Sequence, residues 1–229
     1  MHLVCNLILF VCVLTFAVYT LGADNAVSQA ISGPYYRADG ENDGVALMIN
    51  VYWGTEYVLP MLDVLDEYGA RCTFFVGGSW AAAHGDVLSE IISRGHEVGN
   101  HGYSHLDHAR LTPADGQKEI QKCENKIFEL TGVKTTLFAP PSGAVNESVV
   151  RQAQNLGYNT IMWTKDTIDW RDKNAEIVLK RATNGIKAGD FVLMHPTAHT
   201  LEALPKILAQ IYSQNLRAKT VSQCLNVAT

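Results

Sequence analysis

The 229-residue chain has little net charge and no cluster of basic residues. It carries 18 Lys and Arg against 23 Asp and Glu, so its formal net charge at pH 7 is −5. Nucleic-acid-binding domains usually present a basic patch, so we expect no nucleic-acid partner. Apolar residue types make up 47% of the chain, which excludes intrinsic disorder and predicts a folded protein with a sizeable core.

Charge is missing altogether from the N-terminal segment, because no Lys, Arg, Asp or Glu precedes Asp24. The apolar run at residues 3–22 is long enough to span a bilayer and longer than the apolar region of a usual signal peptide. Residues 1–23 are therefore expected to be either a signal peptide or an uncleaved membrane anchor. A buried core helix is the alternative, which the polar stretch at 24–43 disfavours. Both favoured interpretations predict an extracytoplasmic domain, secreted or anchored to the outer face of the membrane, that meets the membrane only through residues 3–22.

The cysteines lack the spacing of a metal site. Three of them, Cys72, Cys123 and Cys224, follow the apolar segment. Cys72 lies in an apolar run and is expected to be a buried thiol. A disulfide between Cys123 and Cys224 stays open at this point.

After an expected linker at residues 24–44, β-rich runs alternate with helical segments through residues 45–229. The runs span residues 45–51, 71–77, 96–100, 135–140, 159–164, 190–195 and 217–221. Helices are expected at residues 57–68, 86–94, 112–132, 146–157, 173–184 and 199–214. The runs are continuously apolar, as in parallel strands that are covered on both faces. The alternation predicts one α/β barrel, with a doubly wound open sheet as the alternative.

Titratable side chains follow the ends of several runs, where parallel α/β barrels place their chemistry. His101 and His105 are four residues apart and could bind one cation from one face of a helical turn, or be two ordinary loop residues. Asp166 and Asp169 follow the fifth run, and His195 ends the sixth. An Asp beside His195 would make an oriented acid or base, whereas a lone His there could be a satisfied core residue.

Together these motifs resemble those of the polysaccharide deacetylase (NodB-homology, carbohydrate esterase family 4) domains. The string NHGYSH at 100–105, the string DTIDW at 166–170 and the string LMH at 193–195 are similar to three of the family's five motifs. The resemblance covers about residues 45–225. It implies a single distorted (β/α)7 TIM-like barrel. It also implies a hydrolase of non-peptide carbon–nitrogen bonds that removes N-acetyl groups from an amino-sugar polymer such as peptidoglycan or chitin.

The resemblance also implies a role for four of these side chains. A divalent metal, most typically Zn²⁺, would be bound by His101, His105 and an acidic residue. The metal would polarise the acetamide carbonyl and activate a water molecule. His195 would protonate the leaving amine, and Asp169 would orient His195.

Substrate-binding residues can be named in the same way. The backbone N–H of Ser142 is an expected oxyanion donor, a role that does not depend on the side chain. Trp170 is an expected substrate contact. Tyr52, Trp53 and Tyr103 could stack on sugar rings. A buried core position is at least as compatible with Trp53, and also with Trp163.

Three residues depart from the family's motifs. Asn50 stands at the position of the general base, Val51 at that of the acidic metal ligand, and Ala139 at that of the Arg that orients the base. An amide is a very weak base, and a Val side chain cannot bind a metal. Glu56 or Asp107 could replace the missing acid, although ordinary surface positions are the simpler interpretation of both.

Three functions therefore stay open from the sequence. The first is a divergent metal-dependent deacetylase with a substitute ligand or base. The second is a catalytically inactive saccharide-binding pseudoenzyme at the cell envelope. The third is a structural or interaction module without a glycan site. Fold alone does not choose among them.

Overall fold

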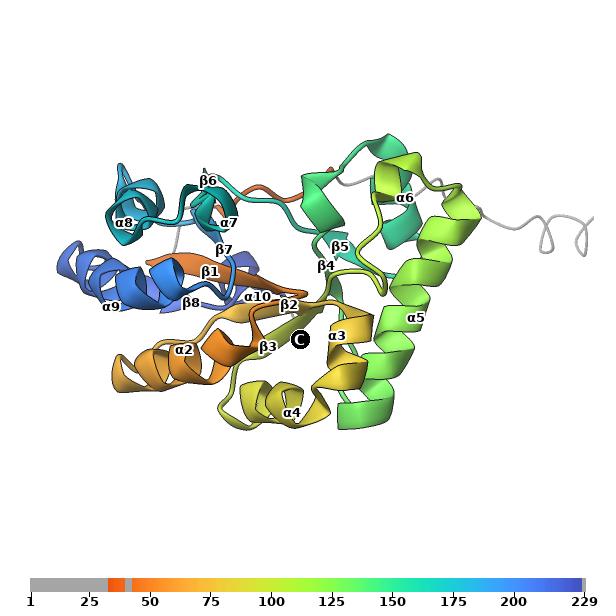
Figure 1. Cartoon of the computed structure of the whole chain (residues 1–229). Coiled ribbons are helices and arrows are strands. Elements are labelled where there is room, and N and C mark those ends of the chain that lie inside the picture. The colour runs from red at the N-terminus through yellow and green to blue at the C-terminus, as the bar shows by residue number, and fades with distance from the viewer. Residues whose placement is uncertain (1–32, 40–42, 228–229) are drawn as a thin grey trace, which may run out of the picture. The chain divides into compact units, whose positions relative to one another are not determined.

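In the computed structural model, which describes residues 33–39 and 43–227, a curled parallel sheet runs through the centre of the protein (Figure 1). The strands are β1 (Gly44–Val51), β2 (Thr73–Val76), β3 (Glu97–Asn100), β4 (Leu137–Phe138), β5 (Asn159–Thr160), β6 (Lys165–Asp166), β7 (Phe191–Met194) and β8 (Arg217–Lys219). Their order is β5-β4-β3-β2-β1-β7-β6, and β8 also pairs with β1. The expected α/β barrel architecture is thus confirmed as a curled sheet of parallel strands. The segment at 1–23 lies outside the described residues.

Helices cover the outside of the sheet. They are α2 (Thr55–Glu67), α3 (Gly78–Ala83), α4 (Gly85–Ser93), α5 (Pro113–Thr131), α6 (Glu147–Gln154), α7 (Asp169–Asp172), α8 (Ala175–Thr183), α9 (Ala198–Ser213) and α10 (Val221–Leu225). Two short 3-10 helices, η1 (His108–Arg110) and η2 (Pro141–Gly143), lie in loops. Neighbouring helices pack side by side in the order α6, α5, α4, α2, α9 and α8 (Figure 1). Among the described helices, none combines the length and apolar character needed to cross a membrane.

The strands β1, β2 and β7 are buried on both faces, which explains their continuously apolar sequences. On β1, Val45, Leu47 and Ile49 point into the outer core with the apolar faces of α2 and α9. The alternate residues Ala46 and Met48 point into an inner core, which also contains side chains from β2, β4 and β7. A strand that packs against two cores cannot alternate apolar and polar residues.

Local capping fixes the helix boundaries. The Thr112 side chain accepts a hydrogen bond from the backbone of Asp115, Pro113 is the first residue of α5, and Gly132 ends the helix in the left-handed region at φ 71°. Asn146 caps α6 in the same way as Thr112 caps α5. These are the positions that the sequence predicts, because the capping residues act on backbone groups within three residues of themselves.

Other elements differ from the expectations. The runs at 135–140 and 159–164 form strands of only two residues each, β4 and β5. Pro140 and Pro141 end the first of these runs, and proline has no N–H to donate to a neighbouring strand. Helix α3 and the short strand β6, at Lys165–Asp166, were not expected.

The segment before β1 pairs with backbone next to β5 and next to β7. Tyr35 pairs with Ile161 beyond β5, and Arg37 pairs with Asp190 beside β7. The backbone N–H of Tyr35 donates to Thr160 O at 2.9 Å, and Met162 N donates to Tyr35 O at 2.8 Å. These residues lie in the segment expected to be a linker at 24–44, yet the compact unit begins at Gly33. Unsatisfied backbone groups at a sheet edge provide the physical reason, because any extended segment can pair with them.

No disulfide joins any two of the three described cysteines. Cys72 is fully buried, as expected. Cys123 is also buried in the outer core, where its Sγ lies 3.4 Å from Val76 O. Cys224 belongs to the inner core, so the open possibility of a Cys123–Cys224 bridge is not realised.

Candidate functional site

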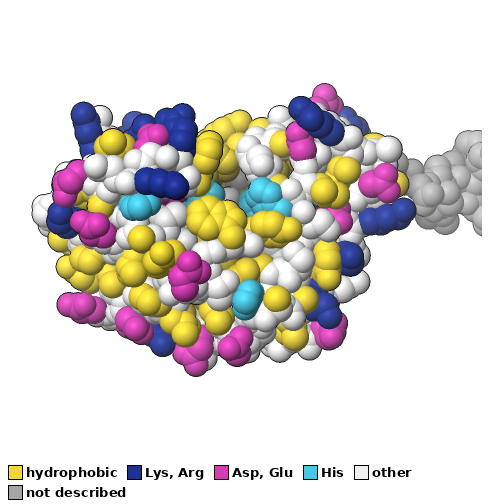
Figure 2. Space-filling model, viewed as in Figure 1, with side chains coloured by type: hydrophobic (Ala, Val, Ile, Leu, Met, Phe, Trp, Pro, Cys, Tyr) yellow, Lys and Arg dark blue, Asp and Glu magenta, His cyan; other side chains and the backbone are white. Residues whose placement is uncertain are grey.

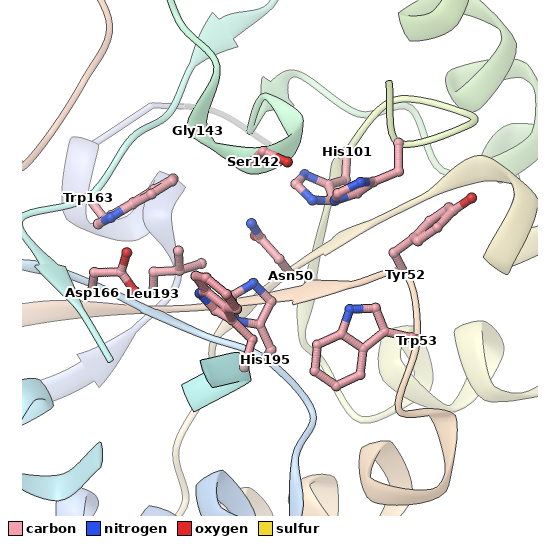
Figure 3. Close-up of a pocket in the computed structure, with 12 residues that line it drawn as sticks. Asn50, Tyr52, Trp53, His101, Ser142, Gly143, Trp163, Asp166, Leu193 and His195 are labelled. Carbon is pink, nitrogen blue, oxygen red and sulfur yellow. The ribbon is translucent and has the colours of Figure 1, made fainter. Parts of the chain in front are cut away.

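A cavity of about 610 Å³ opens at the carboxyl ends of the strands (Figure 3). Its walls come from loops that follow β1, β3, β4, β5 and β7, together with the ends of β1, β6 and β7 and the start of α7. The lining residues are Asn50, Tyr52, Trp53, His101, His105, Ser142, Gly143, Trp163, Asp166, Trp170, Leu193 and His195. Figure 2 shows histidine and apolar side chains next to one another around a hollow in this face. The predicted residues that line this cavity include Asn50, His101, His105, Ser142, Trp170 and His195. Asp169 is not a lining residue and lies directly behind His195.

His101 directly follows β3 and is 2% exposed. Its Nδ1 lies 2.7 Å from the carbonyl oxygen of Ala139. A carbonyl only accepts hydrogen bonds, so this contact places the proton on Nδ1 and leaves Nε2 as the nitrogen with a free lone pair. Burial, followed by the neighbouring His105, lowers the pKa of His101 to about 3. The imidazole is therefore neutral at physiological pH.

His105 lies beside His101, with ring centroids 5.1 Å apart. Its backbone is in the left-handed region at φ 54°, and one face of its ring stacks on Tyr52 at a centroid distance of 4.8 Å. Burial lowers the pKa of His105 as well. Two neutral imidazoles side by side have the chemistry of metal ligands.

A third metal ligand is lacking in the described part of the chain, where no group of three His, Cys, Asp or Glu side chains converges. The suggested substitutes are therefore wrong as ligands. Glu56 is in the first turn of α2 and does not line the cavity. Asp107 instead caps η1 and forms an ion pair with Arg110 at 3.2 Å. The residues present do not fit a protein site with three ligands for Zn²⁺.

Of the three positions that depart from the family's motifs, Asn50 lines the cavity with the two histidines and Ala139 contacts His101 directly. Asn50 is 5% exposed and lines the cavity, and its buried Oδ1 has no hydrogen-bond partner among the described residues. Val51 is fully buried in the outer core. Ala139 is fully buried in the inner core, and its carbonyl accepts the hydrogen bond from His101. This side of the cavity therefore has no carboxylate and no cation.

On the opposite side of the cavity, His195 and Asp169 form a pair in which both carboxylate oxygens accept hydrogen bonds. His195 follows β7, and its Nδ1 lies 2.8 Å from Asp169 Oδ1. The other carboxylate oxygen, Oδ2, accepts from the His195 backbone N–H at 2.7 Å and from Thr200 Oγ1 at 2.5 Å. Burial alone would raise the pKa of Asp169, but the hydrogen bonds from His195 and Thr200 outweigh it and lower that pKa. An ionised Asp169 keeps the Nδ1 proton of His195 and leaves Nε2 for chemistry in the cavity.

Aromatic rings line the mouth of the cavity. Trp170 is 54% exposed and Trp53 is 45% exposed, and Trp53 lies parallel to the His195 ring with centroids 6.0 Å apart. Trp163 also lines the cavity, although the sequence equally suggested a core position. Trp163 is half-buried and also packs against the inner core, so it contacts both the core and the cavity. The strand expected at 159–164 ends at Thr160, which places Trp163 in the following loop. Tyr103 does not line the cavity and instead lies beneath Lys122 Nζ, 3.7 Å from the ring centroid.

Ser142 reaches the cavity through an unusual backbone conformation. It lies in η2 with φ 57° and ψ 14°, between Pro141 and Gly143. Left-handed conformations at non-glycine residues are sparsely populated and concentrate at functional sites. Gly143 follows at φ 66°, and a Cβ there would approach the Trp163 ring to 2.8 Å. The close contact between Gly143 and Trp163 therefore requires a glycine.

The sequence and the structure both match known proteins. The family model described as Polysaccharide deacetylase matches residues 37–161. The chain is 35% identical to the uncharacterized protein YlxY of Bacillus subtilis, an alignment that covers 84% of this chain and 60% of YlxY. It is 32% identical to a peptidoglycan-N-acetylglucosamine deacetylase of Bacillus cereus, covering 74% of this chain and 82% of that enzyme.

Among solved structures, the chain resembles a CE4 family pseudoenzyme from Bacillus anthracis with a TM-score of 0.82 and 35% identity. The match covers 84% of this chain and 69% of that one. A mutant of that pseudoenzyme with restored enzymatic activity matches with the same TM-score and 34% identity. These matches, together with the two histidine motifs and the curled parallel sheet, show that this chain belongs to the polysaccharide deacetylase family.

Proposed function

We propose that this chain is a polysaccharide deacetylase-like hydrolase directed at the acetamido groups of an amino-sugar polymer of the peptidoglycan or chitin type. The observation that supports this most directly is the His195–Asp169 pair, which faces a cavity lined by Trp53, Trp163 and Trp170. Tryptophan faces suit the apolar faces of sugar rings. The peptidoglycan deacetylase of Bacillus cereus, a relative of this chain, supports the substrate class.

The reaction for which this cavity is suited breaks the C–N bond of an acetamido group. Water supplies a hydroxyl to the acyl carbon, and the sugar nitrogen must gain a proton as it leaves. His195 is the proposed donor of that proton, because its Nδ1 is held by Asp169 and its Nε2 is left for the substrate. The backbone N–H of Ser142 is the proposed hydrogen-bond donor to the developing oxyanion.

The side of the cavity that should activate the water supports a second candidate, a catalytically inactive saccharide-binding pseudoenzyme. Asn50 cannot accept a proton at neutral pH, and Val51 cannot bind a metal. General-base catalysis contributes about 10²–10⁴-fold to a reaction rate, so its loss leaves turnover close to background. The CE4 family pseudoenzyme of Bacillus anthracis, a structural relative, favours this candidate.

Members of this family are metal-dependent, and Zn²⁺ is the metal that we propose for this chain if one binds. His101 and His105 would hold it through two imidazole nitrogens. With two protein ligands in place of the usual three, we expect weak binding. The described residues do not form the complete three-ligand site.

We also propose an extracytoplasmic location. Peptidoglycan, the substrate class of the relatives, lies outside the cytoplasmic membrane, and the uncharged apolar segment at 3–22 provides a route of export. The membrane would be a partner only through that segment.

One experiment separates the two candidates. The full chain is incubated with N-acetylchitotetraose and Zn²⁺, acetate release is measured against a His195→Ala control, and binding is measured by calorimetric titration. Acetate above the control supports the hydrolase. Binding without acetate supports the pseudoenzyme. The absence of both acetate release and binding would overturn the proposed function.

A further inference from the structure

Resting on the proposed function, we propose that Asn50 makes this cavity discriminate between acetylated and deacetylated amino sugars. The cavity would accept the neutral acetamido group and reject the ammonium group that remains after the acetyl group is removed. The inference concerns ligand choice, and it holds whether or not the chain performs hydrolysis.

The hydrogen-bonding capacity of Asn50 is not used by the described part of the chain. The residue is 5% exposed at the end of β1, and its Oδ1 is buried without a partner. Figure 3 shows the side-chain nitrogen directed into the space between Ser142, His101 and Trp163. A buried amide with unmet hydrogen bonds is uncommon in folded proteins, which makes a ligand group its natural partner.

An amide group is the complement of an acetamide. Asn50 offers both a donor and an acceptor, and an acetamido group offers a carbonyl acceptor and an N–H donor. The two can therefore pair in either orientation of the Asn50 side chain. An ammonium group offers donors only and carries a charge, so it requires acceptors and preferably a carboxylate.

Negative charge is scarce near Asn50. Of the residues that line the cavity, Asp166 carries the one carboxylate. Figure 3 places Asp166 beside Leu193 and below Trp163, to the left of Asn50, whereas His101 lies to the right of Asn50. Its Oδ1 already accepts from the backbone of Ile168 at 2.9 Å. Asp169 is not a lining residue, and both of its oxygens are occupied by His195 and Thr200.

An ammonium group at Asn50 would thus lose its water without gaining a charged partner. Sites built to hydrogen-bond one group reject an analogue that leaves polar groups unpaired. We expect the acetylated tetrasaccharide to bind at least about tenfold more tightly than its deacetylated counterpart.

The test titrates the full chain at neutral pH with N-acetylchitotetraose and, separately, with fully deacetylated chitotetraose. Asn50→Asp keeps the side-chain shape and adds a carboxylate, so it should tighten binding of the deacetylated ligand and remove the preference. Asn50→Leu keeps the branching at Cγ but removes the hydrogen-bonding groups, and it should weaken binding of the acetylated ligand. Glu56→Gln, at a carboxylate that does not line the cavity, is the control and should leave the preference in place. Circular dichroism checks that each variant is folded.

The outcomes are distinct for the two proposals. Equal affinity of the wild type for both ligands overturns the discrimination and leaves the proposed function standing. A preference that survives unchanged in Asn50→Leu overturns the assignment to Asn50, and so does a preference that is lost in Glu56→Gln as well. Binding of neither tetrasaccharide overturns the proposed function and this inference with it.

Discussion

The two sides of the cavity differ in how completely their polar groups are paired. On the His195 side, both oxygens of Asp169 accept hydrogen bonds, and three donors converge on them. On the Asn50 side, an amide oxygen is buried without a partner among the described residues, and Val51 and Ala139 join apolar cores. Loss of catalytic groups on one side has therefore left the packing and the hydrogen bonds of the other side intact.

This difference shows that the two sides of the cavity are held by separate sets of contacts. Asp169 and His195 are held by α7, β7 and Thr200 at the start of α9, and none of these contacts involves Asn50. His101 and His105 are held by the loop after β3 and by the carbonyl of Ala139, a backbone group that any residue at that position supplies. The substitutions at 50, 51 and 139 could therefore occur without disturbing the positions of the histidines.

The largest effect should come from rebuilding the Asn50 side. The triple variant Asn50→Asp, Val51→Asp and Ala139→Arg supplies a base, an acidic metal ligand and a cation to orient the base. We expect acetate release from N-acetylchitotetraose to rise by about 10²–10⁴-fold with Zn²⁺ present. Adding His195→Ala to the triple variant should abolish the gain. A folded triple variant without any gain would show that the His195 side is not competent either.

The next largest effect should come from disrupting the His195 side. Asp169→Asn keeps the side-chain shape but cannot accept all three hydrogen bonds, so we expect a loss of about 2–3 kcal/mol in the free energy of unfolding at neutral pH. Because folding lowers the pKa of Asp169, its contribution is present above the unfolded value of 3.8 and is lost as pH falls through the folded value. When stability is measured by chemical denaturation, the difference in the free energy of unfolding between wild type and variant should therefore shrink as pH falls from 3.8 through the folded pKa of Asp169.

His101 should make stability depend on pH in a different window. Its pKa falls from 6.5 in the unfolded chain to about 3 on folding. The unfolded state binds more protons between these values, so stability rises with pH across that window and is fully present above it. We expect His101→Gln to flatten this dependence on pH. Over the upper half of the window, the rise in the free energy of unfolding should shrink by on the order of 1–2 kcal/mol. If the free energy of unfolding of the variant, measured by denaturation at several pH values, rose with pH as steeply as that of the wild type, His101 would not be the source of this dependence.

A smaller effect tests the metal on its own. Val51→Asp adds one acidic ligand near His101 and His105, so we expect the affinity for Zn²⁺ to rise at least about tenfold. Competition with a chromogenic chelator measures this directly. Val51→Asn, which adds polarity without the charge, is the control and should give a smaller gain. Equal affinities for wild type and Val51→Asp would place residue 51 outside the reach of the metal.

Much of the fold could be predicted from the sequence, because the signals are local. Continuous apolar runs marked β1, β2, β3 and β7 close to their true bounds. Thr112, Pro113 and Gly132 marked both ends of α5, since caps act within one helical turn. The loop residue Trp163 was harder to place, because the two-residue length of β5 depends on the strands beside it. No local sequence pattern predicts the pairing of Tyr35 with Ile161, because it joins segments that are far apart in the chain.

The sequence by itself determined which chemical groups this protein lacks. Asn50 cannot act as a general base, Val51 cannot bind a metal, and Ala139 cannot supply a positive charge. This holds in any fold, because those capacities belong to the side chains themselves. Only the tertiary structure decided what became of the groups that remain. In the folded chain, the carbonyl of Ala139 places the proton of His101 on Nδ1, and His195 pairs with Asp169. Glu56 and Asp107 do not join the two histidines in a group of three ligands. Such contacts join residues that are distant in the chain, so they depend on how the strands and helices pack and not on any local pattern.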